Sequence, residues 1–243
     1  MRASSSVFTE IKSDNTYMDK LRTLDLSSNP LKTIPDCVYV LVNLKHLSLC
    51  GCQLQSLGDL SMLVHVVQLK LSHNYLTNQS LDTAENTLPP SLTRLDLSHN
   101  QLDAVPCLLA SAPLLTALVC SHNHICQLVQ LTCCSLLCEL DLDYNQVQEL
   151  PEFLSALTKL TSLSLAHNKL AARSVLAPAE QSIHTRIFLL TPLEQLNLQG
   201  NLVSKQELLT FEGVDKLLER RKMTKDKLLQ GGGLSDSSLF GLD

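Results

Sequence analysis

Residues 92–102 of this 243-residue chain read LTRLDLSHNQL, with leucine at the first, fourth, sixth and last positions and asparagine at the ninth. The same spacing, with a few conservative replacements, occurs eight times, from a copy that begins at Leu21 to one that begins at Leu193. Successive copies begin 22 to 33 residues apart, and most steps are 22 or 23 residues. Such regular repetition of one short unit predicts a stack of similar coils rather than a single globular core.

Each apolar position has a predicted role. Leu92, Leu95 and Leu97 are expected to point inward from a short strand, because side chains alternate across a strand with a period of two. Stacked copies then form one parallel sheet. The asparagine that follows is predicted to form a buried amide ladder that satisfies backbone groups where the chain leaves the strand. Seven copies have this residue, at Asn29, Asn74, Asn100, Asn123, Asn145, Asn168 and Asn201, and the second copy has Cys52.

A second apolar line with a proline follows the asparagine in several copies, as at Ile34-Pro35, Val105-Pro106 and Leu150-Pro151. Proline suits the first position of a helix, so short helices are predicted on the outside of the coil. The whole pattern, Leu-x-x-Leu-x-Leu-x-x-Asn-x-Leu-x-x-Leu-Pro-x-x-Leu, resembles that of intracellular leucine-rich-repeat proteins with units of about 23 residues. The resemblance implies an α/β leucine-rich-repeat solenoid, with a curved parallel sheet inside and short helices and loops outside.

Four segments are predicted along the chain. Residues 1–20 form an N-terminal extension or cap, 21–203 the eight repeats, 204–230 a C-terminal capping helix and 231–243 a tail. Apolar residues at helical spacing predict one helix from Glu207 to Leu229 that covers the open end of the last repeat. This end is similar to the cap of small intracellular proteins made almost only of these repeats, which implies a non-enzymatic interaction protein. The long step at 171–192 is either a longer outer helix and loop or a partner-binding protrusion.

Composition and motifs do not favour an enzyme. The chain has 8 glycines, 4% aromatic residues and no tryptophan. It also lacks the short motifs of serine hydrolases, phosphate-binding loops, zinc proteases and dinucleotide-binding folds. We therefore expect no catalytic residues, no metal and no cofactor. We also expect no membrane span and no secretory signal, because no apolar run is long enough for a span and the N-terminal residues are polar.

Nine cysteines are scattered through the repeats, an odd number without the cysteine-rich caps usual in extracellular repeats of this class. This distribution predicts a reducing intracellular compartment, the cytoplasm. The cysteines between Cys120 and Cys138 lack the spacing of zinc ligands, so they are interpreted as structural filler. Residues 21–203 hold 9 Lys or Arg against 14 Asp or Glu. This acidic balance disfavours nucleic acid as a partner, except within a larger assembly.

Function is expected on the concave face, through the variable residues of each strand. The expected surface is mildly basic first, then apolar at Ala117 and Val119, then acidic beside a tyrosine. Mixed charges around an apolar centre with an aromatic residue are typical of protein–protein contact sites. The predicted partner-binding residues are His46, Lys70, Arg94, Asp96, Val119, Glu139, Asp141, Asp143 and Tyr144.

A row of rings is predicted along one rim of the sheet. His73, His99, His122 and His167 each precede the ladder asparagine, and Tyr144 takes that position in the sixth copy. Stacked strands would place neighbouring members about 5 Å apart. The row is either a habitual filling of this repeat or a pH-sensitive binding rim, because stacked imidazoles resist simultaneous protonation.

These features predict a non-enzymatic protein–protein interaction module, a scaffold or regulatory adaptor that is monomeric alone or part of a hetero-complex. The alternative is a constitutive subunit of a large cytoskeletal, ciliary or ribonucleoprotein assembly, anchored by the tails and by the 171–192 insertion. The tail residues Leu239, Phe240 and Leu242 either form a short motif that folds on a partner or belong to an unstructured end.

Overall fold

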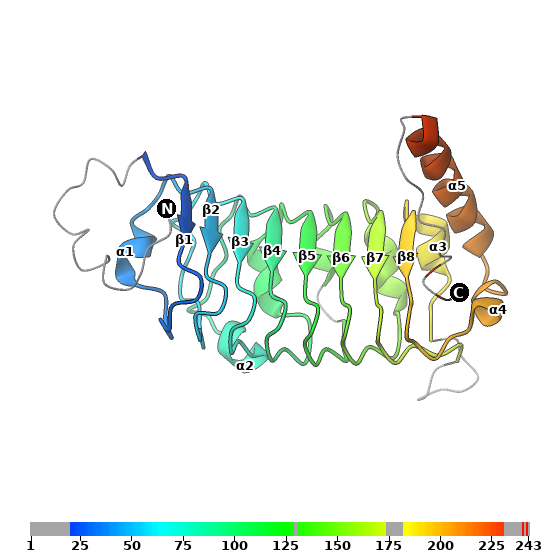
Figure 1. Ribbon diagram of the computed structural model, residues 1–243, viewed down its shortest axis with the longest axis horizontal. Coiled ribbons are helices and arrows are strands. Elements are labelled where there is room, and N and C mark those ends of the chain that lie inside the picture. Colours follow the sequence, from blue (N-terminus) through cyan, green and yellow to red (C-terminus); the bar gives the residue numbers. More distant parts are fainter. Residues whose placement is uncertain (1–19, 129–130, 174–181, 231–239, 241, 243) are drawn as a thin grey trace.

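The computed structural model describes residues 20–128, 131–173, 182–230, 240 and 242 of the chain. Eight three-residue strands form one parallel sheet in which the strands follow each other in sequence order (Figure 1). The strands are β1 (Thr23–Asp25), β2 (His46–Ser48), β3 (Gln68–Lys70), β4 (Arg94–Asp96), β5 (Ala117–Val119), β6 (Glu139–Asp141), β7 (Ser162–Ser164) and β8 (Gln195–Asn197). The chain is therefore a solenoid with one strand in each of eight coils.

The register of the sheet follows from the leucine spacing. The central leucine of each strand lies opposite the central leucine of the next, as Leu95 does with Leu118 and Leu118 with Leu140. These side chains point to the buried side of the sheet, and the leucine two positions later in most coils is buried as well. Because the apolar spacing is the same in every coil, stacking aligns the leucines into one continuous core.

Short helices form much of the layer opposite the sheet. They are α1 (Asp36–Tyr39), α2 (Asn78–Leu81), the 3-10 helices η3 (Cys107–Ser111), η4 (Leu131–Cys133) and η5 (Glu152–Ala156), and α3 (Arg186–Leu190). The prolines Pro35, Pro106 and Pro151 precede α1, η3 and η5 as their N-cap residues. The prediction that these prolines begin short helices is confirmed, with each proline one position earlier than the first helical residue.

The asparagine ladder is present, and five of its seven members are buried, namely Asn74, Asn100, Asn123, Asn145 and Asn168. Asn100 shows the pattern: its Nδ2 donates to the carbonyl oxygens of Leu71 and Leu97 at 3.0 Å, and its Oδ1 accepts from the backbone N–H of Leu76 at 3.1 Å. From Asn74 onward, each such side chain ties its own coil to the preceding one. In the second coil the Cys52 thiol donates to the Leu26 carbonyl at 3.2 Å. A thiol cannot reproduce the accepting role of the amide oxygen as well, so this rung is weaker.

The C-terminal end differs from the single helix predicted over 207–229. The structure has two helices, α4 (Lys205–Leu208) and α5 (Val214–Gln230), which lie with α3 beyond β8 (Figure 1). Gly213 separates them with φ +84°, in the left-handed region that ends helices. A Cβ atom at Gly213 would lie 2.7 Å from Leu189 Cδ2, so the close approach of this turn to α3 also requires glycine.

Several predictions fall outside the described residues. These are the structure of residues 1–19, the centre of the long step at 174–181, and the tail residues 231–239, Leu239 among them. The two described tail residues, Phe240 and Leu242, contact the apolar core of the solenoid. The predicted boundaries of the four segments stay predictions.

Candidate functional site

The face of the sheet opposite the core carries the first and third residues of each strand, and we call it the sheet face. It corresponds to the predicted concave face. His46, Lys70, Arg94 and Glu139 are exposed on it, whereas Asp96, Val119 and Asp141 are half-buried. Asp143 and Tyr144 follow β6 at the edge of this face, with Asp143 half-buried and Tyr144 exposed. All nine predicted residues thus lie on or beside one surface.

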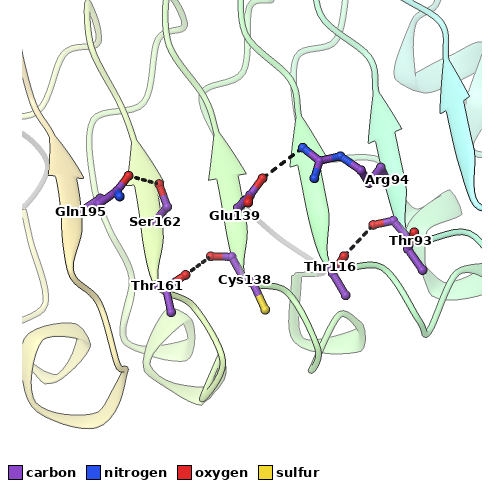
Figure 2. A network of polar contacts seen from close by, with 8 residues as sticks. All are labelled: Thr93, Arg94, Thr116, Cys138, Glu139, Thr161, Ser162 and Gln195. Carbon is purple, nitrogen blue, oxygen red and sulfur yellow. Dashed lines mark hydrogen bonds and ion pairs between the residues drawn. The ribbon is translucent and has the colours of Figure 1, made fainter. Parts of the chain in front are cut away.

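An ion pair crosses the middle of the sheet face (Figure 2). Arg94 of β4 reaches over β5 to Glu139 of β6, with Nη2 3.2 Å from Oε2, and both side chains are 55% exposed. Ala117 lies between them in the register and is only 4% exposed. The expectation that Ala117 forms an exposed apolar contact is therefore wrong. A methyl group between two long side chains that join above it leaves little surface for a partner.

Threonines order the start of the strands beside this ion pair (Figure 2). Thr116 Oγ1 donates to the Thr93 carbonyl at 3.0 Å, and Thr161 Oγ1 donates to the Cys138 carbonyl at 3.2 Å. Cys138 occupies the corresponding position of the sixth coil, where its thiol donates instead to the Leu136 carbonyl at 3.4 Å. Side-chain hydrogen bonds between successive coils hold the strands that present Arg94 and Glu139.

Three carboxylates gather on the sheet face, and we call Asp96, Asp141 and Asp143 the acidic group. Asp96 and Asp141 lie on either side of Val119 in the register of β4, β5 and β6. Each accepts a backbone N–H from the residue two positions later, Asp96 from Ser98 and Asp141 from Asp143, both at 3.0 Å. These bonds orient the carboxylates at the end of their strands.

Electrostatics within the acidic group are unfavourable. Burial raises the pKa of Asp141 above its usual range, and the negative charges of Asp143 and Asp96 raise it further, although the Asp143 N–H and nearby His122 oppose this. Asp143 is better satisfied, because it accepts from Ser164 Oγ and the Ala166 N–H, both at 2.6 Å. Among the described residues, no lysine or arginine forms an ion pair with these three carboxylates.

A stack of five rings runs beside the acidic group, and we call His73, His99, His122, Tyr144 and His167 the ring ladder. Successive ring centroids are 4.0 to 4.3 Å apart, and the planes differ by 10 to 16°. The predicted row of rings is confirmed, with slightly closer spacing than expected. All five residues have φ between 53° and 58°, in the left-handed region, and the other three coils have Ser28, Gly51 and Gly200 there, also with positive φ.

Stacking affects the protonation of the ring ladder. The pKa of His99 is lowered from its ordinary value, first because its neighbours bury it and then because His73 and His122 flank it, although Asp96 opposes the shift. Beyond His167 the stack meets backbone, since a Cβ atom at Gly200 would lie 2.5 Å from His167 Nδ1. The ring ladder therefore ends where glycine leaves room for the last imidazole.

The strands bring together some of the predicted residues and keep others apart. Arg94 and Glu139 meet directly, and Asp96, Val119, Asp141, Asp143 and Tyr144 form one neighbourhood. His46 on β2 is separated from that neighbourhood, which begins at Asp96 on β4, by strand β3. Sequence reasoning did not anticipate the ion pair across Ala117. The sequence did contain a signal for this ion pair, because Ala117 lies between two oppositely charged residues at equivalent positions of the neighbouring strands.

Within the described ranges, no group of three or more His, Cys, Asp or Glu side chains could hold a metal ion. All nine cysteines lie in the described part of the chain, where none of them forms a disulfide bond. No helix in the described part of the chain combines the length and the apolar character required to cross a membrane.

Comparison with family models recognises leucine-rich repeats in the chain. A model of two repeat copies matches residues 19–61, and a single-repeat model matches 89–105 and 156–177. Podocan-like protein 1 of mouse is 38% identical over 94 residues, which is 38% of this chain and 17% of that protein. A probable serine/threonine-protein kinase, pats1, of Dictyostelium discoideum is 38% identical over 99 residues, 38% of this chain and 3% of that protein. The chain thus spans less than a fifth of the length of these relatives.

Solved structures share the fold over most of the chain. Internalin C2 of Listeria monocytogenes is 25% identical, with a TM-score of 0.59 over 81% of this chain and 79% of that one. A second internalin of that bacterium is 19% identical, with a TM-score of 0.56 over 83% and 62% of the two chains. Together with the eight-stranded parallel sheet, these matches confirm the predicted leucine-rich-repeat solenoid. Folds of this kind are generally non-enzymatic and typically bind proteins.

Proposed function

We propose that this leucine-rich-repeat solenoid is a non-enzymatic scaffold or regulatory adaptor that binds a partner protein on its sheet face. The acidic group carries the proposal. Asp141 is half-buried among like charges, an arrangement that costs stability in the free protein. Residues that are unfavourable for folding and lie on a surface are frequent at functional sites, where a ligand relieves the cost.

The chemistry of the acidic group indicates the character of the partner. A lysine or arginine of another protein would neutralise Asp96 and Asp141. The faces of the adjacent Tyr144 ring are stacked on His122 and His167, but the residue is 47% exposed, so the edge of the ring is available to the same partner. Val119 supplies an apolar floor between the two carboxylates. A basic segment with an apolar residue beside its cation fits this surface, because complementary charge around an apolar centre gives both attraction and specificity.

Charge exchange on the sheet face tests the proposal. The variant combines Lys70→Glu, Arg94→Glu, Glu139→Lys and Asp141→Lys, which leaves the net charge of the chain unchanged. A matched control exchanges Asp103→Lys and Lys159→Glu, both exposed outside the sheet face. Affinity purification with quantitative mass spectrometry should recover the same partner with the wild type and the control, and lose it with the sheet-face variant. Retention of the partner by a folded sheet-face variant would contradict the proposal.

A single substitution sharpens the assignment to the acidic group. Asp141→Asn keeps an oxygen that accepts from the Asp143 N–H but removes the charge. We expect it to raise the melting temperature slightly and to weaken partner binding at least tenfold, because an ionic contact in a partly desolvated site is lost. Unchanged affinity together with raised stability would show that the charge of Asp141 destabilises the fold but is not used in partner binding.

The alternative of a constitutive subunit in a large assembly remains a second proposal. The contact of Phe240 and Leu242 with their own solenoid does not support an anchor formed by these two residues. Limited proteolysis of the chain, alone and within any purified complex, distinguishes the roles. Protection of the 171–192 insertion only within a complex would favour the assembly subunit over the adaptor.

We also propose a reducing intracellular compartment for the chain. The nine described cysteines form no disulfide bond with one another, and Cys107 and Cys126 are exposed, which suits an environment in which exposed thiols stay reduced. Microscopy of the tagged protein with compartment markers tests this, and localisation to the secretory pathway would contradict it.

A further inference from the structure

The C-terminal end of the solenoid is closed by a residue of the tail. Phe240 is only 1% exposed and belongs to the hydrophobic core, and Leu242 packs against the same core from its margin. α5 also contributes to this contact, because the guanidinium of its Arg221 lies over the Phe240 ring, 5.8 Å from the ring centroid. Phe240 therefore occupies an apolar site with a cation on one face of its ring.

The backbone of Phe240 continues the hydrogen-bond pattern of the sheet. In the preceding coils, the N–H of the residue after each strand, usually a leucine, donates to the carbonyl of the third residue of the next strand. Leu142 donates in this way to Ser164 at 2.8 Å, and Leu165 to Asn197 at 2.9 Å. After β8, the Leu198 N–H donates to the Phe240 carbonyl at 2.8 Å. The tail thus takes the place that a ninth strand would have at this position.

The conformation of Phe240 shows that its contacts hold it in place. Its φ of 62° lies in the left-handed region, which is unfavourable for a phenylalanine. Such a conformation persists where surrounding contacts impose it. The contacts described above supply that constraint: one backbone hydrogen bond, a buried ring and a cation over the ring.

We infer that the end of the solenoid, between β8 and α5, is a binding site for a peptide segment that carries a phenylalanine, and that Phe240 of the chain's own tail is its resident ligand. Main-chain pairing with an exposed sheet edge supplies affinity that depends little on sequence, and the buried ring supplies specificity. A peptide with the same features on another chain competes with the tail. The site goes beyond the proposed function, because it lies at the end of the solenoid and uses none of the sheet-face residues.

A labelled synthetic peptide with the sequence of residues 234–243, LSDSSLFGLD, tests this inference by fluorescence anisotropy. In the full-length Phe240→Ala variant the tethered tail loses its ring, so we expect the peptide to bind at least tenfold more tightly than to the wild type. A peptide with alanine in place of the phenylalanine should bind neither protein. Equal binding of the two peptides, or no binding to the folded variant, would overturn the inference.

Three further variants secure the test. Phe240→Leu retains an apolar side chain and replaces Phe240→Ala if that variant does not fold, as judged by circular dichroism; it should bind the peptide more tightly than the wild type does. In the Phe240→Ala background, Arg221→Ala should weaken peptide binding through loss of the cation over the ring. Met223→Ala is the matched control on α5, where Met223 is exposed, and should leave binding unchanged. Because no sheet-face partner takes part, failure here is distinct from failure of the proposed function.

Discussion

Cys52 shows at the scale of one residue how the asparagine ladder works. Its thiol reaches the Leu26 carbonyl, but the Leu31 N–H, which a ladder amide would bind, pairs with the Cys52 carbonyl at 3.0 Å instead. In the following coils the corresponding N–H bonds to a side-chain oxygen, as the Leu54 N–H does to Asn74 Oδ1 at 2.9 Å. The first and second coils are thus joined by fewer side-chain hydrogen bonds than the coils that follow.

Cys52→Asn should stabilise the protein. The substitution restores an amide that both donates and accepts at a buried position, and one net hydrogen bond contributes about 1 kcal/mol. Urea unfolding followed by circular dichroism would measure a higher midpoint. The opposite kind of substitution at another rung of the ladder, Asn100→Cys, is the control and should lower the urea midpoint. A lower midpoint for Cys52→Asn would mean that the second coil has no room for the amide.

Protonation of the ring ladder is a second effect at this scale. The folded state lowers the pKa of His99, whereas the unfolded chain has the ordinary value of about 6.5. The unfolded state therefore binds the proton more readily, and the contribution of His99 to stability is lost as the pH falls below about 6.5. The nearby Asp96 moderates the effect.

We expect NMR titration to place the His99 midpoint below about 6.5. His73→Ala uncovers one face of the ring and removes a neighbouring charge, so it should raise that midpoint. His65→Ala is the control, because His65 is exposed and outside the ring ladder. A wild-type midpoint at or above the ordinary value would contradict the lowering of the His99 pKa by burial and by the flanking histidines.

Among the elements, the C-terminal cap depends on the turn between α4 and α5. Arg220 of α5 donates to the carbonyl oxygens of Phe188 at 2.8 Å and Leu193 at 2.9 Å. These bonds satisfy backbone acceptors near the end of α3, as a capping element must. Gly213 sets the direction of α5 and so places Arg220 over those acceptors.

Gly213→Ala should cost about 1 to 3 kcal/mol, because a Cβ atom there meets Leu189 and the residue has a left-handed φ. Urea unfolding measures the loss. Glu212→Ala, at the exposed neighbouring position, should change stability by less than about 0.5 kcal/mol. Equal stability of the two variants would show that α5 shifts without cost.

The whole molecule is a one-dimensional stack, so the position of a defect along it matters. A coil contacts its neighbours, and central coils have two of them whereas terminal coils have one. Leu118 of β5 is fully buried between Leu95 and Leu140, and Leu24 of β1 has a partner in β2. Loss of Leu118 weakens two interfaces in the middle of the core.

Leu118→Ala should destabilise the protein by about 2 to 5 kcal/mol and separate its unfolding into two transitions. Leu24→Ala should cost less and leave one main transition. Urea unfolding followed by circular dichroism distinguishes the two patterns, because it gives the number of transitions and the dependence of each unfolding free energy on urea concentration. A single sharp transition for Leu118→Ala would indicate that cooperativity extends across the defect.

Local and repeated features of the fold could be predicted from the sequence. Strand positions, the direction of Leu95 and Leu118, the amide of Asn100 and the stacking of His99 all depend on contacts between equivalent positions of adjacent coils. Because every coil has nearly the same spacing, one register satisfies all of them. The same reasoning placed the predicted binding residues on or beside one face, although their role as contacts stays a prediction.

Contacts that break the repeat depended on the tertiary structure. Ala117 is buried because Arg94 and Glu139 are long enough to join above it, and strand alternation does not encode that reach. The cap divides at Gly213 because α3 approaches it, and Phe240 is buried because the open edge of the sheet offers a partner for its carbonyl. These contacts join residues with no periodic relation, so only the folded chain brings them together.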